Sequence, residues 1–166
     1  MVAMRFCQLD QITLFEPGVR IEARRRLRAD EDYLRDHFPR FAVMPGVLML
    51  EALTQAAVLL ARATEGYQAG LVYLESAKSI KFADFVQPGQ VLIISAEIIK
   101  RDGDRTLLKV SGRKDASVAV SGRLVLKHKM MSGTSEPSTV DRHANLFMKK
   151  LTEGLLREPT PDKSGS

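Results

Sequence analysis

The sequence predicts an α+β domain in which an antiparallel sheet wraps around one long helix. Three observations lead to this fold class. From Val47 to Thr64 nearly every residue is apolar, which is typical of a helix enclosed on most sides. Shorter segments that alternate apolar and polar residues lie before and after this helix. Turn sequences rich in Gly, Asp and Pro separate the later segments, and such turns favour hairpins between neighbouring strands.

Length and composition fit one domain that buries a core and stays soluble, with 166 residues of which 45% are hydrophobic and 27% charged. The single cysteine, Cys7, excludes an intrachain disulfide and favours a reducing compartment, so we expect a cytoplasmic protein. The first residues show no secretory signal. The longest apolar run, residues 41–61, is interrupted by Pro45, Glu51 and Gln55, so we expect no membrane span.

The net charge of +5 arises within residues 1–130, because acidic and basic residues balance after Met130. Part of it comes from a cluster of arginines in one segment: Arg24, Arg25, Arg26 and Arg28. Such a surface would steer an acidic partner toward the protein, whereas the ordinary alternative is a solvated charged face. Ten aromatic residues, no tryptophan and no nucleic-acid motif make nucleic acid the weaker partner class.

The segments before the long helix predict one strand and a loop. In residues 19–29 apolar and charged residues alternate, which is the period of a half-exposed strand. Residues 8–16 are short and mixed, and residues 30–36 indicate a polar loop that could contain one helical turn. Pro45 and Gly46 begin the helix, since a proline at the first turn lacks only an N–H that would have no partner there.

Four further stretches after the helix predict strands or strand pieces: residues 70–86 (in two pieces), 91–100, 106–113 and 117–129. Gly66, directly after Glu65, is the expected C-terminal cap of the helix. The sequence QPGQ at residues 87–90 is a turn pattern, and Asp102-Gly103 predicts a hairpin.

The end of the chain predicts an appended helix. Apolar residues recur at helical spacing within residues 139–157: Val140, Ala144, Phe147, Leu151 and Leu155. Ser138 and Asp141 resemble a capping box. We therefore divide the chain into a domain of residues 1–130 and an extension of residues 131–166, made of a flexible linker, a short amphipathic helix and a flexible tail.

The candidate chemistry lies in HFPRFAVMPGVLMLEALTQ, residues 37–55. Burying the Glu51 carboxylate in an apolar helix costs several kcal/mol unless another group satisfies it or the protein uses it. Gln55 lies one turn later on the same face, where its amide could hold that carboxylate in one rotamer. The structural alternative is that Glu51 pairs with an arginine of the sheet and only fixes the helix.

A histidine and a helix start complete this set. His37 could fold back over the helix start or reach a partner chain, although a lone histidine is more often structural, as we expect for His128 and His143. Backbone N–H groups after Pro45 could stabilise an oxyanion. Apolar surroundings would keep Glu51 protonated, and an imidazole suits removal of a proton next to a carbonyl. Together these groups fit proton abstraction next to a thioester with loss of a β-hydroxyl.

The same stretch resembles the hallmark of the FabZ-type 3-hydroxyacyl-(acyl carrier protein) dehydratases, whose pattern is close to HFPxxPVMPGVLxxEAxAQ. The matching residues are His37, Phe38, Pro39, residues 43–48, Glu51, Ala52 and Gln55. The likeness covers about residues 8–129 and continues through Tyr73, Ile80, Lys81, Phe82, Val86, Pro88 and Gly89. It departs from the pattern at residues 40–42 and 75–79, and at Gln90, where the family's turn usually has Asp.

The resemblance implies a hotdog fold, in which a long central helix is wrapped by an antiparallel sheet. It implies homodimers with two active sites at the interface, often assembled as trimers of dimers. His37 of one subunit would be the base that removes the C2 proton, and Glu51 of the other the acid that protonates the leaving 3-hydroxyl. Backbone N–H groups at Gly46 and Val47 would polarise the thioester carbonyl.

Two further site residues follow from the resemblance: Gln55 as a substrate-site residue, and Tyr73 as the tyrosine that gates the acyl tunnel in some members. The implied substrate is a (3R)-3-hydroxyacyl chain on acyl carrier protein, and the product is the trans-2-enoyl chain. The basic surface would meet the acidic carrier protein. No cofactor, metal, nucleic acid or membrane is implied, because the phosphopantetheine belongs to the carrier.

Three alternatives stay open. A FabA-type dehydratase/isomerase usually has Asp where this chain has Glu51. A hotdog thioesterase uses an acid on the helix and a water, and does not need His37. A non-catalytic module that binds acyl chains or carrier protein is supported only by the altered loop at residues 40–42.

Overall fold

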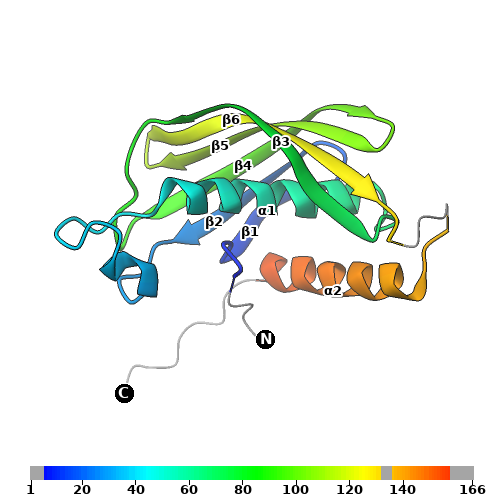
Figure 1. Ribbon diagram of the computed structural model, residues 1–166, viewed down its shortest axis with the longest axis horizontal. Coiled ribbons are helices and arrows are strands. Elements are labelled where there is room, and N and C mark those ends of the chain that lie inside the picture. The colour runs from blue at the N-terminus through cyan, green and yellow to red at the C-terminus, as the bar shows by residue number, and fades with distance from the viewer. Residues whose placement is uncertain (1–5, 132–135, 158–166) are drawn as a thin grey trace, which may run out of the picture.

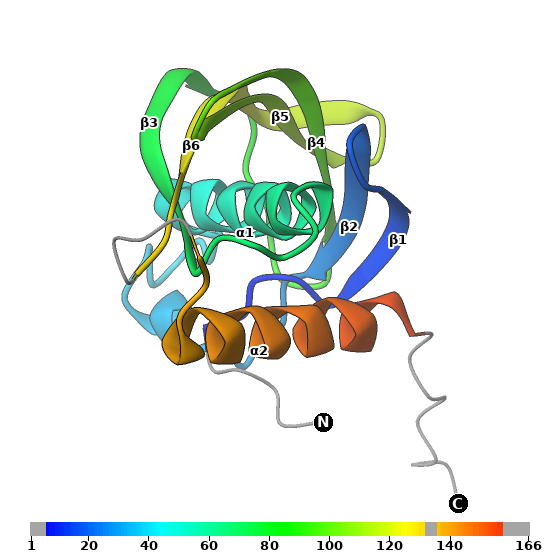
Figure 2. The same ribbon diagram turned by 90° about the vertical axis from the view of Figure 1, so that its right-hand side faces the viewer.

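A curved antiparallel sheet wraps around helix α1 (Gly46–Thr64), and a second helix, α2 (Thr139–Leu156), lies on the side of α1 away from most of the sheet (Figures 1 and 2). This computed structural model describes residues 6–131 and 136–157. The six strands are β1 (Gln11–Glu16), β2 (Arg20–Arg26), β3 (Leu71–Phe82), β4 (Val91–Asp102), β5 (Arg105–Lys114) and β6 (Ser117–Lys129). The predicted α+β class, with the sheet around one long helix, is confirmed.

The segments before α1 contain one more strand than the sequence predicted, and the loop contains a helical turn. Residues 8–16, which had no clear pattern, contain β1, and the polar loop contains the short 3-10 helix η1 (Asp32–Arg35). Much of the predicted linker and nearly all of the predicted tail fall on residues 132–135 and 158–166, outside the described residues, as does the very start of the chain.

The strand order β1-β2-β4-β5-β6-β3 leaves β1 and β3 as the two edges. The two predicted pieces of residues 70–86 form one strand, which ends at Phe82, so the expectation of strand through residues 83–86 is wrong. Two breaks in register against β6 bend this strand, and Ser79 at the second break has a positive φ of 54°. Gly89 (φ 88°) and Gly103 (φ 58°) lie in the predicted turns.

The inner face of the sheet packs on one side of α1. The fully buried side chains of this core include Ile21, Leu53, Leu60, Leu92, Ile94, Leu108, Leu124 and Leu126. By length and composition α1 could cross a membrane, but its buried side is the core of this fold. Another side of α1 stays open: Val47 is 69% exposed and Glu51 is exposed. The prediction that most sides of this helix are enclosed therefore fails along this face.

Helix α2 begins with the predicted capping box, in which Ser138 Oγ accepts from the Asp141 N–H and the Asp141 carboxylate accepts from the Ser138 N–H. Its predicted apolar face is wrong in the first half, because Val140 and Phe147 are exposed. Asp141 and Asn145 are buried there instead. The reason is polar: the buried guanidinium of Arg62 at the end of α1 needs an acceptor, and Asn145 supplies one at 3.0 Å.

Candidate active site

The loop between η1 and α1 fixes the imidazole of His37. Nδ1 lies 3.2 Å from the backbone carbonyl oxygen of Val43. A carbonyl can only accept a hydrogen bond, so Nδ1 carries the hydrogen and Nε2 is left as the basic nitrogen. The ring also contacts the ring of Phe38, whose backbone φ of 60° turns the chain sharply directly after His37. In the neutral ring, this arrangement leaves Nε2 as the nitrogen that can accept a proton.

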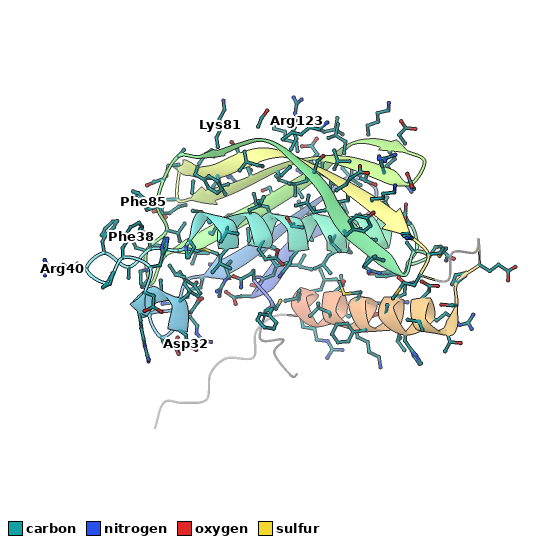
Figure 3. All side chains as sticks on the ribbon, in the orientation of Figure 1. Asp32, Phe38, Arg40, Lys81, Phe85 and Arg123 are labelled. Carbon is teal, nitrogen blue, oxygen red and sulfur yellow. The ribbon has the colours of Figure 1, made fainter. Side chains whose placement is uncertain are left out.

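His37 lines a pocket of about 240 Å³ together with the start of α1 and the end of β3. In that pocket the ring of Phe82 rests on Gly46, where an added Cβ would lie only 3.0 Å from Cε1 of the ring. Glycine therefore favours the close approach of β3 to the helix start, because a Cβ here would make the Phe82 ring shift by a few tenths of an ångström. Figure 3 shows Phe38 and Phe85 near this end of α1 and Arg40 at the tip of the loop.

The first N–H groups of α1 are available to a ligand. Pro45 precedes the helix and provides no side-chain cap, while its carbonyl accepts from the N–H groups of Leu48 and Met49. Within the described chain this leaves the N–H groups of Gly46 and Val47 without a backbone acceptor. They lie at the positive end of the helix dipole, where developing negative charge would be stabilised, and Gly46 lines the His37 pocket.

Glu51 lies on the open face of α1, and Gln55 holds its carboxylate. The amide nitrogen of Gln55 lies 2.9 Å from Oε1 of Glu51. Gln55 is itself fixed, because it donates to the carbonyl of Phe6 at 2.9 Å and accepts from the N–H of Gln8 at 2.7 Å. The expected role of Gln55 in orienting the acid is therefore supported by this geometry.

The expectation that Glu51 is buried in an apolar setting is wrong for the single chain, where the side chain is exposed. The sheet covers the opposite face of α1 and α2 leaves the Glu51 side chain exposed, so an enclosure would have to come from another molecule. Nor does Glu51 make an ion pair with any residue in the part of the chain that the structure describes. This argues against the alternative in which it only fixes the helix to an arginine of the sheet.

Glu51 lines a second pocket, of about 260 Å³. Tyr73 at the start of β3 lines the same pocket, so the structure brings this predicted residue close to the acid. Three residues that sequence reasoning did not place in the site also line it: Met148, Leu151 and Leu155 of α2. The helical spacing of Leu151 and Leu155 predicted an amphipathic helix, but no pattern in the sequence indicates against which surface that helix packs.

In the part of the chain that the structure describes, His37 and Glu51 line different pockets. The pocket of His37 is lined by residues at the start of α1, whereas that of Glu51 lies farther along the helix and does not include His37. The single chain therefore holds the predicted base and the predicted acid, each oriented by a hydrogen bond, in two different pockets.

His128 lies outside both pockets, buried among polar side chains, which fits the structural role that we expected. Its Nε2 lies 2.9 Å from the hydroxyl of Thr106 and its Nδ1 lies 2.7 Å from the carboxylate of Glu65. This order of hydroxyl, imidazole and carboxylate resembles a hydrolase triad. However, Thr106 is only 2% exposed, so its hydroxyl is not accessible to a substrate. The cluster connects β5 and β6 to the end of α1. His143 is exposed on α2.

Only part of the predicted arginine cluster forms an open basic surface, since Arg24 and Arg26 are exposed. Arg25 is buried and lies 2.6 Å from the carboxylate of Glu31, and Arg28 pairs with Asp30. Exposed cations also gather on the outer face of the sheet, where Lys78, Arg123 and Lys109 are cross-strand neighbours on β3, β6 and β5. Lys81 and Arg123 extend from this face, away from α1 (Figure 3). Among the described residues, no group of His, Cys, Asp or Glu could hold a metal ion.

Comparison with known proteins places these features in a family. A family model described as a FabA-like domain matches residues 2–129. A 3-hydroxyacyl-[acyl-carrier-protein] dehydratase FabZ from Thiobacillus denitrificans is 36% identical over 130 residues, which cover 76% of this chain and 86% of that relative. The enzyme of the same name from Ruminiclostridium cellulolyticum is 34% identical over 119 residues, covering 72% and 84%.

Solved structures share the fold at much lower identity. The dehydratase heterocomplex ApeI:P from Xenorhabdus doucetiae matches with a TM-score of 0.64 and 16% identity, over 77% of this chain and 86% of that one. A Streptococcus mutans protein solved with bound acetyl CoA matches with a TM-score of 0.60 and 12% identity, over 83% and 98%. The expected hotdog fold is thereby confirmed.

Proposed function

This chain belongs to the FabA-like domain family, and from its FabZ relatives we propose that it is a 3-hydroxyacyl-(acyl carrier protein) dehydratase of fatty acid or related acyl chain biosynthesis. It removes water from a (3R)-3-hydroxyacyl thioester and forms the trans-2-enoyl thioester. The relatives share more than two thirds of their length with this chain, so the proposal concerns the whole catalytic domain.

The observation that carries the proposal is the hydrogen bond from His37 Nδ1 to the Val43 carbonyl. It leaves Nε2 as the base that takes the C2 proton of the substrate. The electrons of that C–H bond form the C2–C3 double bond as the C3–O bond breaks. A thioesterase of this fold would need no such base, so the fixed tautomer favours the dehydratase.

Glu51 is the proposed acid. Its proton passes to the leaving 3-hydroxyl, which departs as water. The proton that His37 took from C2 must then pass to the Glu51 carboxylate, which restores both groups. The hydrogen bond from Gln55 supports this role, because it holds Oε1 and leaves Oε2 for the substrate. The N–H groups of Gly46 and Val47 would stabilise the negative charge that develops on the thioester carbonyl.

We propose that the complete site forms between two copies of this chain, with His37 of one facing Glu51 of the other. Two observations support this: the residues line separate pockets in one chain, and an apolar surface is left open around the start of α1. The exposed side chains of this surface are Phe38, Phe41, Val47, Phe82 and Phe85. A second copy that covers the open face of α1 would also shield Glu51 from water.

The remaining parts of the proposal concern partners and location. The acyl carrier protein is acidic, and the exposed Lys78, Lys109 and Arg123 offer a basic surface that would steer it toward the enzyme. We place the enzyme in the cytoplasm and propose a homodimer, or a trimer of such dimers, as its working form.

Mixed dimers test both the activity and the sharing of the site. Wild type should dehydrate 3-hydroxyacyl carrier protein, and His37→Ala and Glu51→Ala should each be nearly inactive. When the two variants are co-expressed, about half of the dimers are mixed and each mixed dimer has one intact site, so roughly a quarter of wild-type activity should return. Turnover by wild type without such recovery would show that each site uses one chain only. No turnover by wild type, with release of free thiol instead, would select the thioesterase.

A further inference from the structure

Helix α2 lies outside residues 2–129, which the family model matches, yet it forms one wall of the pocket that holds Glu51. It crosses α1 at a large angle, on the side of α1 away from most of the sheet (Figures 1 and 2). Leu155 is fully buried, and Met148 and Leu151 are half-buried against the core. The extension is therefore part of the proposed site, and not only an attachment to the fold.

The position of α2 is fixed by buried polar contacts at its start. Arg62 of α1 donates to the Asn145 side chain at 3.0 Å and to the carbonyls of Ala69 and Gly70 at 3.2 and 3.1 Å. The fully buried carboxylate of Asp141 accepts from the Met131 N–H at 2.8 Å. If α2 moved away, Arg62 would lose its contact with Asn145 and the Met131 N–H would lose its acceptor, so these contacts hold the helix in one place.

The pocket itself is small and, apart from a few groups, apolar. Across from Met148 and Leu151, its other walls include Val58 of α1 and Val72 of β3. Glu51 and Tyr73 supply polar atoms in the same hollow. Its volume of about 260 Å³ lies just under the roughly 300–1,000 Å³ that ligand pockets usually have. Such a hollow fits a short apolar chain beside an acid.

We propose that α2 closes the acyl pocket beside Glu51, so that Met148 and Leu151 limit the enzyme to short 3-hydroxyacyl chains. The inference rests on the proposed dehydratase function, because it assumes that the acyl chain of the 3-hydroxyacyl substrate occupies this pocket. Leu155 lies deeper and supports the wall. Removing a side chain from this wall should admit longer chains, because each further methylene that becomes buried improves binding by about fourfold.

The test compares 3-hydroxybutyryl, 3-hydroxyoctanoyl and 3-hydroxypalmitoyl carrier protein as substrates. Wild type should prefer the shorter chains. Met148→Ala and Leu151→Ala should raise the ratio of kcat/KM for the long chain over the short chain by about tenfold or more, as a few more methylenes become buried. Leu151→Phe should shift the preference in the opposite direction. Leu146→Ala removes an equal volume from the exposed side of α2 and should leave the ratio unchanged.

Two outcomes would overturn the inference: a wild type that uses palmitoyl-length substrate as well as the short one, or wall variants that change all three substrates by the same factor. Binding of butyryl- and palmitoyl-pantetheine, measured by calorimetry, separates this from the proposed function. If no substrate is turned over but binding still depends on chain length and on Leu151, the dehydratase function is rejected. The role of α2 in limiting the length of the bound chain would then still stand. Circular dichroism of each variant confirms that the change is not a loss of fold.

Discussion

The side-chain amide of Gln55 donates to the carboxylate of Glu51 across one turn of α1, at 2.9 Å, and the same amide group also binds the backbone at Phe6 and Gln8. One residue therefore connects the proposed acid to the segment that enters β1. The rotamer of Glu51 is set by a side chain that the rest of the protein already holds.

Replacing Gln55 by Leu should reduce kcat more than it raises KM, because the acid stays in place but loses its orientation. We expect a loss of about tenfold or more, similar to other outer contacts that orient a reactive group. Steady-state kinetics measure the effect. Gln68→Leu is the matched control, since Gln68 is exposed and bonds only to the carbonyl of Gly66 among the described residues. Equal losses in both variants would contradict the orienting role.

His37→Gln should lower kcat by about 10²–10⁴-fold, the usual contribution of a general base. Glutamine keeps a donor for the Val43 carbonyl and preserves the loop, so the loss would come from the missing base. His143→Gln, on the exposed face of α2, should have wild-type activity. A His37→Gln enzyme with more than half of the wild-type rate would exclude this histidine from the chemistry.

Asn145→Ala should destabilise the protein by about 1–3 kcal/mol, because it leaves a buried N–H of Arg62 without its acceptor. Urea unfolding measures this as a lower midpoint. The exposed neighbour His143, changed to Ala, should alter stability by no more than about 0.5 kcal/mol. If both substitutions have the same effect, the buried contact does not hold α2.

Gly70→Ala should also loosen α2, for a steric reason. An added Cβ would lie 1.6 Å from Oδ1 of Asp141, so the carboxylate that caps α2 would have to move. Overpacking of this kind costs about 1–3 kcal/mol. Gly18→Ala is a useful contrast, because its Cβ would meet nothing within 4 Å and only the positive φ of 84° opposes it. Proteolysis of α2 should be faster in the Gly70 variant alone.

The pKa of Glu75 lies below its usual range, first because Arg105 donates two hydrogen bonds to the carboxylate, at 2.7 and 2.8 Å. A folded-state pKa below the unfolded value means that the pair stabilises the fold above the unfolded pKa. That stabilisation is lost as the pH falls through the folded pKa. Arg105→Met should return the titration of Glu75 to the ordinary acidic range, as observed by NMR. An unchanged titration would show that Arg105 is not the cause.

Much of the fold could be predicted because its signals are local. The apolar helix, the turn at residues 87–90, the hairpin at Gly103 and the capping box at Ser138 each depend on neighbouring residues, and each is present. The buried face of α2 could not be predicted in the same way. It is decided by Arg62, far away in the sequence, which draws the polar Asn145 inward in place of the apolar Phe147.

The candidate site could be predicted in its residues but not in its surroundings. The pairing of Glu51 with Gln55 follows from helical spacing and is present. The apolar composition of the helix could not predict that Glu51 is exposed, since composition does not reveal which face of the helix the sheet covers. The same limit applies to the contribution of Met148 and Leu151, because it depends on where a separate helix packs.

The position of β3 has a consequence for the order in which this chain can fold. β3 joins the sheet only through β6, so Leu71 finds its partner Lys129 after all the intervening strands have been synthesised. The meander from β4 to β6 can form first from neighbouring hairpins, whereas closing β3 onto it requires a distant and therefore slow pairing. On the ribosome, an unpaired strand edge would wait for the end of β6, and that interval is when this protein would be most exposed to aggregation.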